Sequence, residues 1–247
     1  MKKLIIFLAI VLYAQNIEKI FIDVNKKITI PKPKSDFILK DYSFYGSYKV
    51  KPFYIGKYEI SIKEYNNYLK FNHKKLINAE YPDEPITFVD FDTAQKVCKF
   101  YKGRLPTELE WIVASSIKIN DSKCFKSLKK GKFYRYAIGK YPLSYKDDIL
   151  KCFLKIDDEV EPSLIGSEKN DVEYSYENIN GTYGMFGNVW EWVNRDVTYN
   201  KKHYKVIKGG SYANFNQNAL YDNRVSNFLN PMEKRDNVGF RCVWEKK

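Results

Sequence analysis

The stretch that decides the fold runs from Asn180 to Trp192 and reads Asn-Gly-Thr-Tyr-Gly-Met-Phe-Gly-Asn-Val-Trp-Glu-Trp. Its glycines recur at every third position, and glycine adopts backbone conformations that other residues avoid. The stretch closes on two tryptophans, whose large side chains favour burial in a core. An irregular, glycine-turned segment that leads tryptophans into a core predicts a domain built on ordered loops.

Four other short segments combine turn residues with aromatic and charged residues in a similar way. They are 52–60 (PFYIGKYEI), 103–111 (GRLPTELEW), 208–212 (KGGSY) and 237–242 (NVGFRC). No internal repeat or heptad series connects them, so each segment is an independent signal.

Read in chain order, the five segments resemble the formylglycine-generating enzyme family, also known as sulfatase-modifying factors, over about residues 45 to 244. The resemblance implies an α+β, C-type-lectin-like fold. Such a fold has small antiparallel sheets, a few short helices and long ordered loops. One segment alone would be weak support, whereas five in the family's order are specific.

Local patterns independently predict short helices in the first half of the chain. A serine or threonine followed three residues later by glutamate forms a capping box, and this pattern predicts helices after Ser61 and Thr107. Between them, Asp90 or Asp92 is expected to cap a further helix that carries Cys98 on its buried face. Three short helices agree with the fold implied by the resemblance.

The remainder of the chain is predicted to hold short strands and loops. Residues 37–60 are rich in Tyr, Phe, Val and Ile between turn residues, which favours strands. Residues 17–34 sustain neither a helical nor a strand period and are interpreted as an extended arm. Beyond residue 116 turn residues are frequent, so the second half is predicted to be dominated by loops around short strands.

The first fourteen residues have the layout of a secretory signal peptide, with Lys2 and Lys3 before an apolar run, Leu4–Leu12, and Ala14 after it. An apolar run of this length is too short to cross a bilayer, which needs about 20 residues. We therefore expect export to the periplasm or cell surface and no membrane span after signal removal.

The predicted organisation is a signal peptide over residues 1–14, an N-terminal arm over 15–44 and one domain over 45–247. The chain carries 42 lysines and arginines against 30 acidic residues. Its lysines are scattered rather than clustered, which is typical of a solvated surface and argues against nucleic acid as the partner. The oligomeric state does not follow from the sequence.

Four cysteines are available, at positions 98, 124, 152 and 242. An even number in an oxidising compartment predicts two disulfides, with three possible pairings. The resemblance implies that Cys98 pairs with Cys242, as in some family members. Cys124 and Cys152 are then left to close the lysine-rich irregular segment between them.

The chemistry that gives the family its name is missing from this sequence. The resemblance implies oxidation of a substrate cysteine by two thiolates that follow Gly-Gly-Ser and bind copper(I), a soft metal that prefers sulfur ligands. After Gly209, Gly210 and Ser211, an ungapped alignment puts Asn214 and Ala219 at those two positions. We therefore expect no copper and no cysteine-to-formylglycine oxidase activity.

The old catalytic position is nevertheless a candidate groove for a peptide or glycan. Its expected residues are Ser211, Tyr212, Asn214, Asn216 and Arg224. We interpret the protein as a non-catalytic binding or scaffold module. Two alternatives are an oxidoreductase or cofactor-maturation enzyme that uses other residues, and a structural subunit of an envelope complex.

A structural calcium ion is a further expectation. Asn188 and Glu191 offer oxygen ligands three residues apart in a glycine-turned loop, a chemistry that suits Ca²⁺, and the resemblance implies such an ion around this loop. The alternative is that both side chains only hydrogen-bond within the core. Arg104 and Arg241 are expected to be structural, paired with buried carboxylates or stacked on rings.

Overall fold

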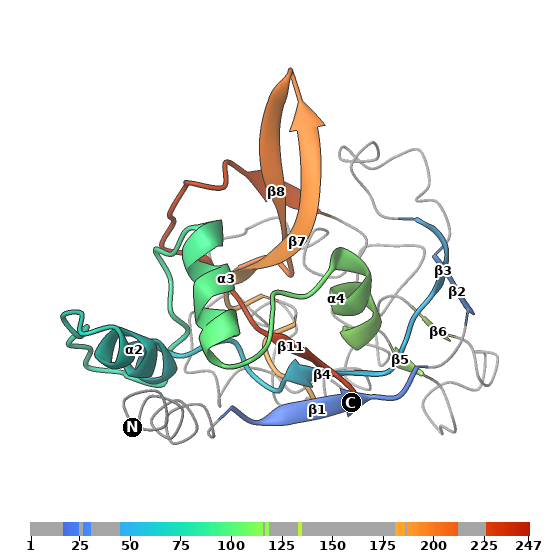
Figure 1. Ribbon diagram of the computed structural model, residues 1–247. Helices are drawn as coiled ribbons and strands as arrows, with labels where there is room; N and C mark the ends of the chain where they lie inside the picture. The colour runs from blue at the N-terminus through green and yellow to red at the C-terminus, as the bar shows by residue number, and fades with distance from the viewer. Residues whose placement is uncertain are drawn as a thin grey trace, which may run out of the picture.

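The computed structural model describes residues 17–24, 27–30, 45–115, 117–118, 133–134, 181–185, 187–211 and 226–247. The predicted signal peptide, the Cys124–Cys152 pair and most of the candidate groove lie outside the described residues. The elements are labelled as in Figure 1.

The first described strand and the last one share a sheet. In order across this sheet lie β1 (Lys19–Ile22), β4 (Phe53–Gly56) and β11 (Val243–Glu245), all antiparallel. Figure 1 shows this sheet at the base of the molecule, with β4 between β1 and β11 and the C-terminus next to β1. The two ends of the described chain are thereby tied together.

The N-terminal arm is therefore not free of regular structure, and that part of the prediction is wrong. After β1, strand β2 (Lys27–Ile30) pairs with β3 (Gly46–Lys49) in a second, two-stranded sheet. Both arm strands have four residues, too few to establish a period in the sequence. Tertiary pairing, rather than local pattern, makes them strands.

A long hairpin is the main regular element among the described residues of the C-terminal half. It consists of β7 (Trp190–Tyr199) and β8 (Lys202–Lys208), and the full sheet has the order β10-β7-β8-β9, with β10 (Val238–Gly239) parallel to β7. Strand β9 covers Asn227–Leu229. In Figure 1 the hairpin projects from the body on the side opposite β1.

Strands β7 and β8 are longer than the short strands expected in this half, whereas β9, β10 and β11 have two or three residues each. Asn200 and Lys201 turn the hairpin with φ values of 47° and 62°. Two consecutive left-handed residues are what a two-residue hairpin turn of the favoured twist requires, and Asn is among the residues that tolerate them. A further pair, β5 (Ile117–Lys118) with β6 (Phe133–Tyr134), is short.

The three predicted helices are confirmed. They are α2 (Ile62–Phe71), α3 (Phe91–Phe100) and α4 (Glu108–Ala114), and complete capping boxes start α2 and α4. Asp90, not Asp92, caps α3 by accepting a hydrogen bond from the Thr93 N–H at 2.7 Å. Among the described residues, no helix has the length and apolarity to cross a membrane.

The main core lies between α2, α3 and the strands of the long hairpin. Trp190 and Trp192 are buried in it, as the sequence predicts, and the Trp192 indole N–H donates to the Val89 carbonyl at 3.0 Å. Phe91 meets Trp192 edge-on with ring centroids 5.9 Å apart. The hydrogen bond satisfies the indole's polar atom, so its full area stabilises the core.

The predicted Cys98–Cys242 disulfide is present. It joins α3 to the residue just before β11, with the two Cα atoms 5.4 Å apart and 144 positions apart in sequence. Both cysteines are fully buried. The bridge therefore closes a loop that contains most of the domain.

Removing this bridge should lower stability strongly. We predict that Cys98→Ala with Cys242→Ala reduces the free energy of unfolding by about 4 kcal/mol, because the open chain regains the entropy that a long closed loop removes. Urea unfolding under oxidising conditions measures the loss. Cys124→Ala with Cys152→Ala is the matched control; it opens at most a much shorter loop and should cost less. An unchanged unfolding midpoint for the first variant would contradict the prediction.

Candidate functional site

Arg241 is a fully buried cation at the centre of the domain. Its Nε donates to both oxygens of Glu191, at 2.9 and 2.8 Å, and its Nη2 donates to Glu191 Oε1 at 2.7 Å. Both side chains have no exposed area. Charge-assisted hydrogen bonds of this geometry offset part of the cost of removing two charges from water.

Arg241 and Glu191 also form hydrogen bonds with the surrounding segments of the chain. Arg241 Nη1 donates to the Gly56 carbonyl at 3.1 Å and Nη2 donates to the Tyr183 carbonyl at 2.6 Å. The Trp111 indole N–H donates to Glu191 Oε2 at 2.9 Å. The ion pair therefore ties together β4, α4, the loop before β7, β7 itself and the segment before β11.

Glu59 brings a second carboxylate to the same guanidinium. Its Oε2 lies 3.5 Å from Arg241 Nη2 but has no hydrogen-bond partner, while its Oε1 accepts from Asn188 Nδ2 at 3.0 Å. Gly184, with φ of 66°, leaves room for it, since a Cβ there would lie 2.2 Å from Glu59 Oε1. The cluster holds two carboxylates for one guanidinium.

The environment of Glu59 favours its neutral form. Burial raises the pKa of Glu59 to about 7; the Glu191 charge adds to the rise, and the Arg241 charge opposes it. One proton on Glu59 gives the three side chains a net charge of zero. Below about pH 7 this proton balances the charge of the cluster.

Asn188 and Glu191 do not fit a shared calcium site as they are placed. Both oxygens of Glu191 accept hydrogen bonds from Arg241, so a cation there would face a guanidinium. The Asn188 side-chain nitrogen is directed at Glu59. No group of three His, Cys, Asp or Glu within the described part of the chain is arranged to hold a metal ion. Calcium binding by this loop stays a prediction, and these contacts do not support it.

A second buried ion pair lies where β8 ends. Lys208 Nζ donates to Glu108 Oε1 at 3.0 Å and to Ser226 Oγ at 3.1 Å. Ser226 Oγ also donates to Glu108 Oε1, and Arg195 pairs with Glu108 Oε2. Glu108 therefore joins the start of α4 to β7, β8 and the residue before β9.

The Gly-Gly-Ser motif, Gly209 to Ser211, directly follows Lys208 in the chain. Gly209 and Gly210 have φ values of 96° and 80°, so the expected left-handed backbone is present. A Cβ on Gly209 would lie 3.2 Å from the Met185 carbonyl oxygen and from the Trp111 ring. The Gly187 N–H donates to the Gly209 carbonyl at 2.9 Å, which fixes the two glycine turns against each other.

Ser211 is fully buried and its Oγ accepts from Asn237 Nδ2 at 3.0 Å. Its side chain therefore packs against Asn237 inside the described part of the domain and does not line an open surface. The other expected groove residues, Tyr212, Asn214, Asn216 and Arg224, lie outside the described residues.

The expected structural roles of the two arginines agree with their contacts. Besides the Arg241 pair, Arg104 binds Glu110 through two parallel hydrogen bonds of 2.7 Å. Sequence reasoning missed Glu59, Glu108 and Lys208 as buried charges. Glu108 resembles an ordinary acidic residue in a first helical turn, and nothing in its neighbours along the chain signals that a lysine 100 positions away meets it.

The terminal strands closed into one sheet, the glycine-turned loops and the buried ion pairs define a loop-rich α+β domain of the formylglycine-generating-enzyme type. The family model described as the sulfatase-modifying factor enzyme 1-like domain matches residues 44–246. The chain belongs to this family.

Sequence relatives support this assignment. The inactive C-alpha-formylglycine-generating enzyme 2 of Bos taurus is 26% identical over 164 residues, which cover 64% of this chain and 50% of the relative. The Bacillus subtilis protein YfmG, itself uncharacterized, is 22% identical over 236 residues, covering 78% of this chain and 46% of the relative. The chain spans about half the length of these curated relatives.

Solved structures share the fold. CarF superposes with a TM-score of 0.58 at 16% identity, covering 94% of this chain and 99% of CarF. PvdO from Pseudomonas aeruginosa gives a TM-score of 0.56 at 16% identity, covering 90% of this chain and 91% of PvdO. At this level of identity the likeness concerns the fold alone.

The raised pKa of Glu59 predicts a dependence of stability on pH. An unfolded glutamate has a pKa of about 4.3, so between pH 4.5 and 7 the folded state holds a proton that the unfolded state releases. The free energy of unfolding should therefore fall as pH rises through this range. Relative to Glu59→Gln, the native chain should lose on the order of 2 kcal/mol between pH 5 and 8.

Urea unfolding at the two pH values, with a chelator present, measures this difference. Comparison with the Glu59→Gln variant cancels contributions from other titrating groups. Glu245→Gln, at an exposed side chain of β11, is the matched control and should follow the native chain. If the free energy of unfolding changed equally with pH in the native chain and in Glu59→Gln, the prediction that folded Glu59 holds a proton would be wrong.

Proposed function

We propose that this chain is an exported, non-catalytic binding or scaffold module of the formylglycine-generating-enzyme family. Its partner is a peptide or a glycan, held at the surface formed by the segment after Gly209, Gly210 and Ser211. Cysteine-to-formylglycine oxidation is not among its activities.

The observation that carries the proposal is the absence of thiols at the family's reactive position. No cysteine occurs between Cys152 and Cys242, and Asn214 and Ala219 stand at the two aligned positions. Cys242 itself is closed in a disulfide with Cys98 and offers no thiolate. Without a thiolate pair, copper(I) has no suitable ligands there.

The scaffold beneath that position is intact, which supports a retained binding role. The Glu108–Lys208 pair, the two left-handed glycines and the Asn237–Ser211 hydrogen bond fix the chain up to Ser211, where that segment begins. Mammalian relatives whose names describe them as inactive share the domain. Loss of the reaction with conservation of the framework is compatible with a protein that binds.

Export is proposed on two grounds. The first residues have the composition of a signal peptide, and the domain contains a disulfide, which persists in oxidising compartments and is rare in reducing ones. Periplasm and cell surface both satisfy these grounds.

Oxygen uptake and copper binding test the missing chemistry directly. We predict that the full chain, supplied with copper(I) and a cysteine-containing peptide, consumes no oxygen above the peptide control and leaves the peptide mass unchanged. The variant Asn214→Cys with Ala219→Cys should gain copper(I) binding, because it restores two thiolates in the aligned positions. Oxidised peptide from the native chain would overturn the proposal in favour of an enzyme with other catalytic residues.

Peptide and glycan arrays then address the binding role. Tyr212→Ala with Arg224→Ala should abolish capture of the ligand found, whereas Lys201→Ala at the exposed hairpin turn should retain it. Unchanged capture by the first variant would place the binding surface elsewhere. Purification of the native chain only within a large envelope complex would favour a structural subunit instead.

A further inference from the structure

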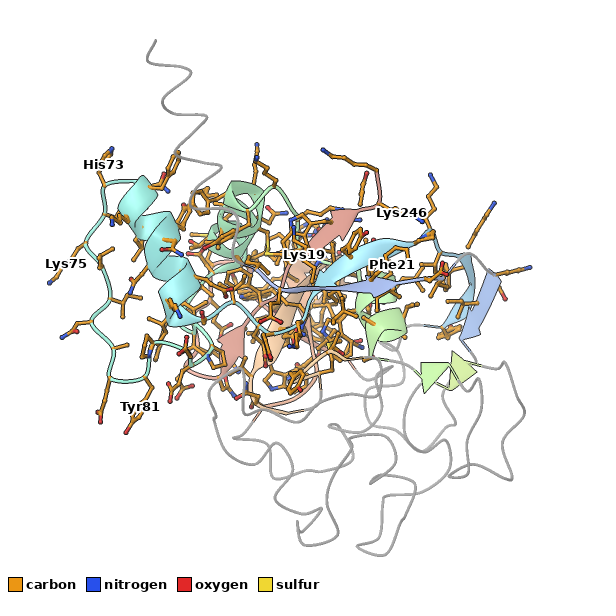
Figure 2. The ribbon with its side chains drawn as sticks, turned by 90° about the horizontal axis from the view of Figure 1, so that it is seen from below. Lys19, Phe21, His73, Lys75, Tyr81 and Lys246 are labelled. Atoms are coloured by element: carbon orange, nitrogen blue, oxygen red, sulfur yellow. A yellow bond between two sulfur atoms is a disulfide. The ribbon has the colours of Figure 1, made fainter. Side chains whose placement is uncertain are left out.

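The loop that follows α2 exposes seven consecutive residues, 72–78, which read Asn-His-Lys-Lys-Leu-Ile-Asn. Within it Leu76 is 49% exposed and Ile77 is 38% exposed, and Tyr81 further along is 55% exposed. Figure 2 shows this loop at the edge of the molecule beside α2, with His73, Lys75 and Tyr81 pointing away from the body. An adjacent pair of aliphatic side chains is thus presented to solvent on a projection.

The backbone of this loop is fixed, so the exposure is built into the fold. The Asn66 side chain on α2 accepts from the Ile77 N–H at 2.8 Å and donates to the Ile77 carbonyl at 2.9 Å. The Lys74 N–H donates to the Leu69 carbonyl at 2.9 Å, and the returning segment is held where the Lys63 N–H donates to the Pro82 carbonyl at 2.8 Å. Turning Ile77 inward would break both bonds to Asn66.

Two exposed lysines, Lys74 and Lys75, directly precede the aliphatic pair. Glu80 is the one acidic residue of the loop 73–81, and Asp83, on the returning segment, is paired with Lys63. Lysine side chains bury their methylene stems along an apolar surface while their ammonium groups remain in water. A loop with a fixed backbone, two exposed aliphatic residues and two lysines next to them in sequence has the composition of an interfacial anchor.

We propose that the loop of residues 73–81 docks on the surface of an anionic lipid bilayer. Leu76 and Ile77 enter the boundary between headgroups and acyl chains, and Lys74 and Lys75 lie at the level of the anionic headgroups. Tyr81 has the amphipathic ring that suits the same depth. The attachment is peripheral and does not depend on the binding role proposed above.

The chemistry of the loop favours lipid over other partners. Aliphatic side chains cannot stack on bases as aromatic ones do, which argues against single-stranded nucleic acid. Two aliphatic side chains and one ring offer far less than the roughly 800 Å² per partner that a stable protein interface buries. A fluid bilayer accepts such a small wedge, because it adapts to the shape of the loop.

Hydrogen exchange of the full chain with vesicles tests the proposal at the loop itself. The probe is phosphatidylcholine vesicles with one quarter phosphatidylglycerol, and phosphatidylcholine alone is the neutral control. We predict that amides of residues 75–80 exchange at least about threefold more slowly with the anionic vesicles only, because docking excludes water. The amides of the hairpin turn at 200–202 should not change.

Variants distinguish docking of this loop from the general attraction of a basic protein to anionic vesicles. Lys74→Glu with Lys75→Glu should abolish the loop's protection, and Leu76→Ser with Ile77→Ser should do the same at equal charge. Lys201→Glu with Lys202→Glu makes the same charge change on the other projection and should leave the protection intact. Unprotected loop amides on vesicle-bound chain, or equal effects of the two lysine variants, would overturn the proposal.

Discussion

The ion pair between Arg241 and Glu191 is the interaction on which the rest of the structure depends. It lies in the interior, and its hydrogen bonds reach β4, α4, β7 and the segment before β11. A domain made of short strands and loops cannot satisfy its backbone through long ladders. Here a single guanidinium supplies donors to three backbone carbonyls, at Gly56, Lys57 and Tyr183.

Several other features are arranged around this pair. Cys242 follows Arg241 directly and binds α3 covalently, while the Gly56 N–H donates to the Cys242 carbonyl at 2.8 Å. The ionic, covalent and backbone connections thus converge within a few residues. The Glu108–Lys208 pair repeats the principle beneath the Gly-Gly-Ser turn. Fully hydrogen-bonded buried charges of this kind hold loops in fixed positions.

Local chemistry explains what could be predicted from the sequence. Capping boxes at Ser61 and Thr107 act within a few residues, so the helices were foreseeable, and so was burial of the tryptophans at the start of β7. The pairing of Cys98 with Cys242 needed the family resemblance. The arm strands, Glu59 and Lys208 depend on partners far along the chain, and no local pattern signals a long-range partner. Those were missed.

The buried ion pairs maintain this fold in a chain that lacks the family's reactive thiols. The most direct test of their role is the free energy of unfolding of Glu191→Gln, which keeps the shape of the side chain and removes its charge. We predict a loss of about 3–5 kcal/mol, because Arg241 would remain buried without its main counter-ion. A loss below about 1 kcal/mol would contradict it, since the framework would then stand on packing and the disulfide alone.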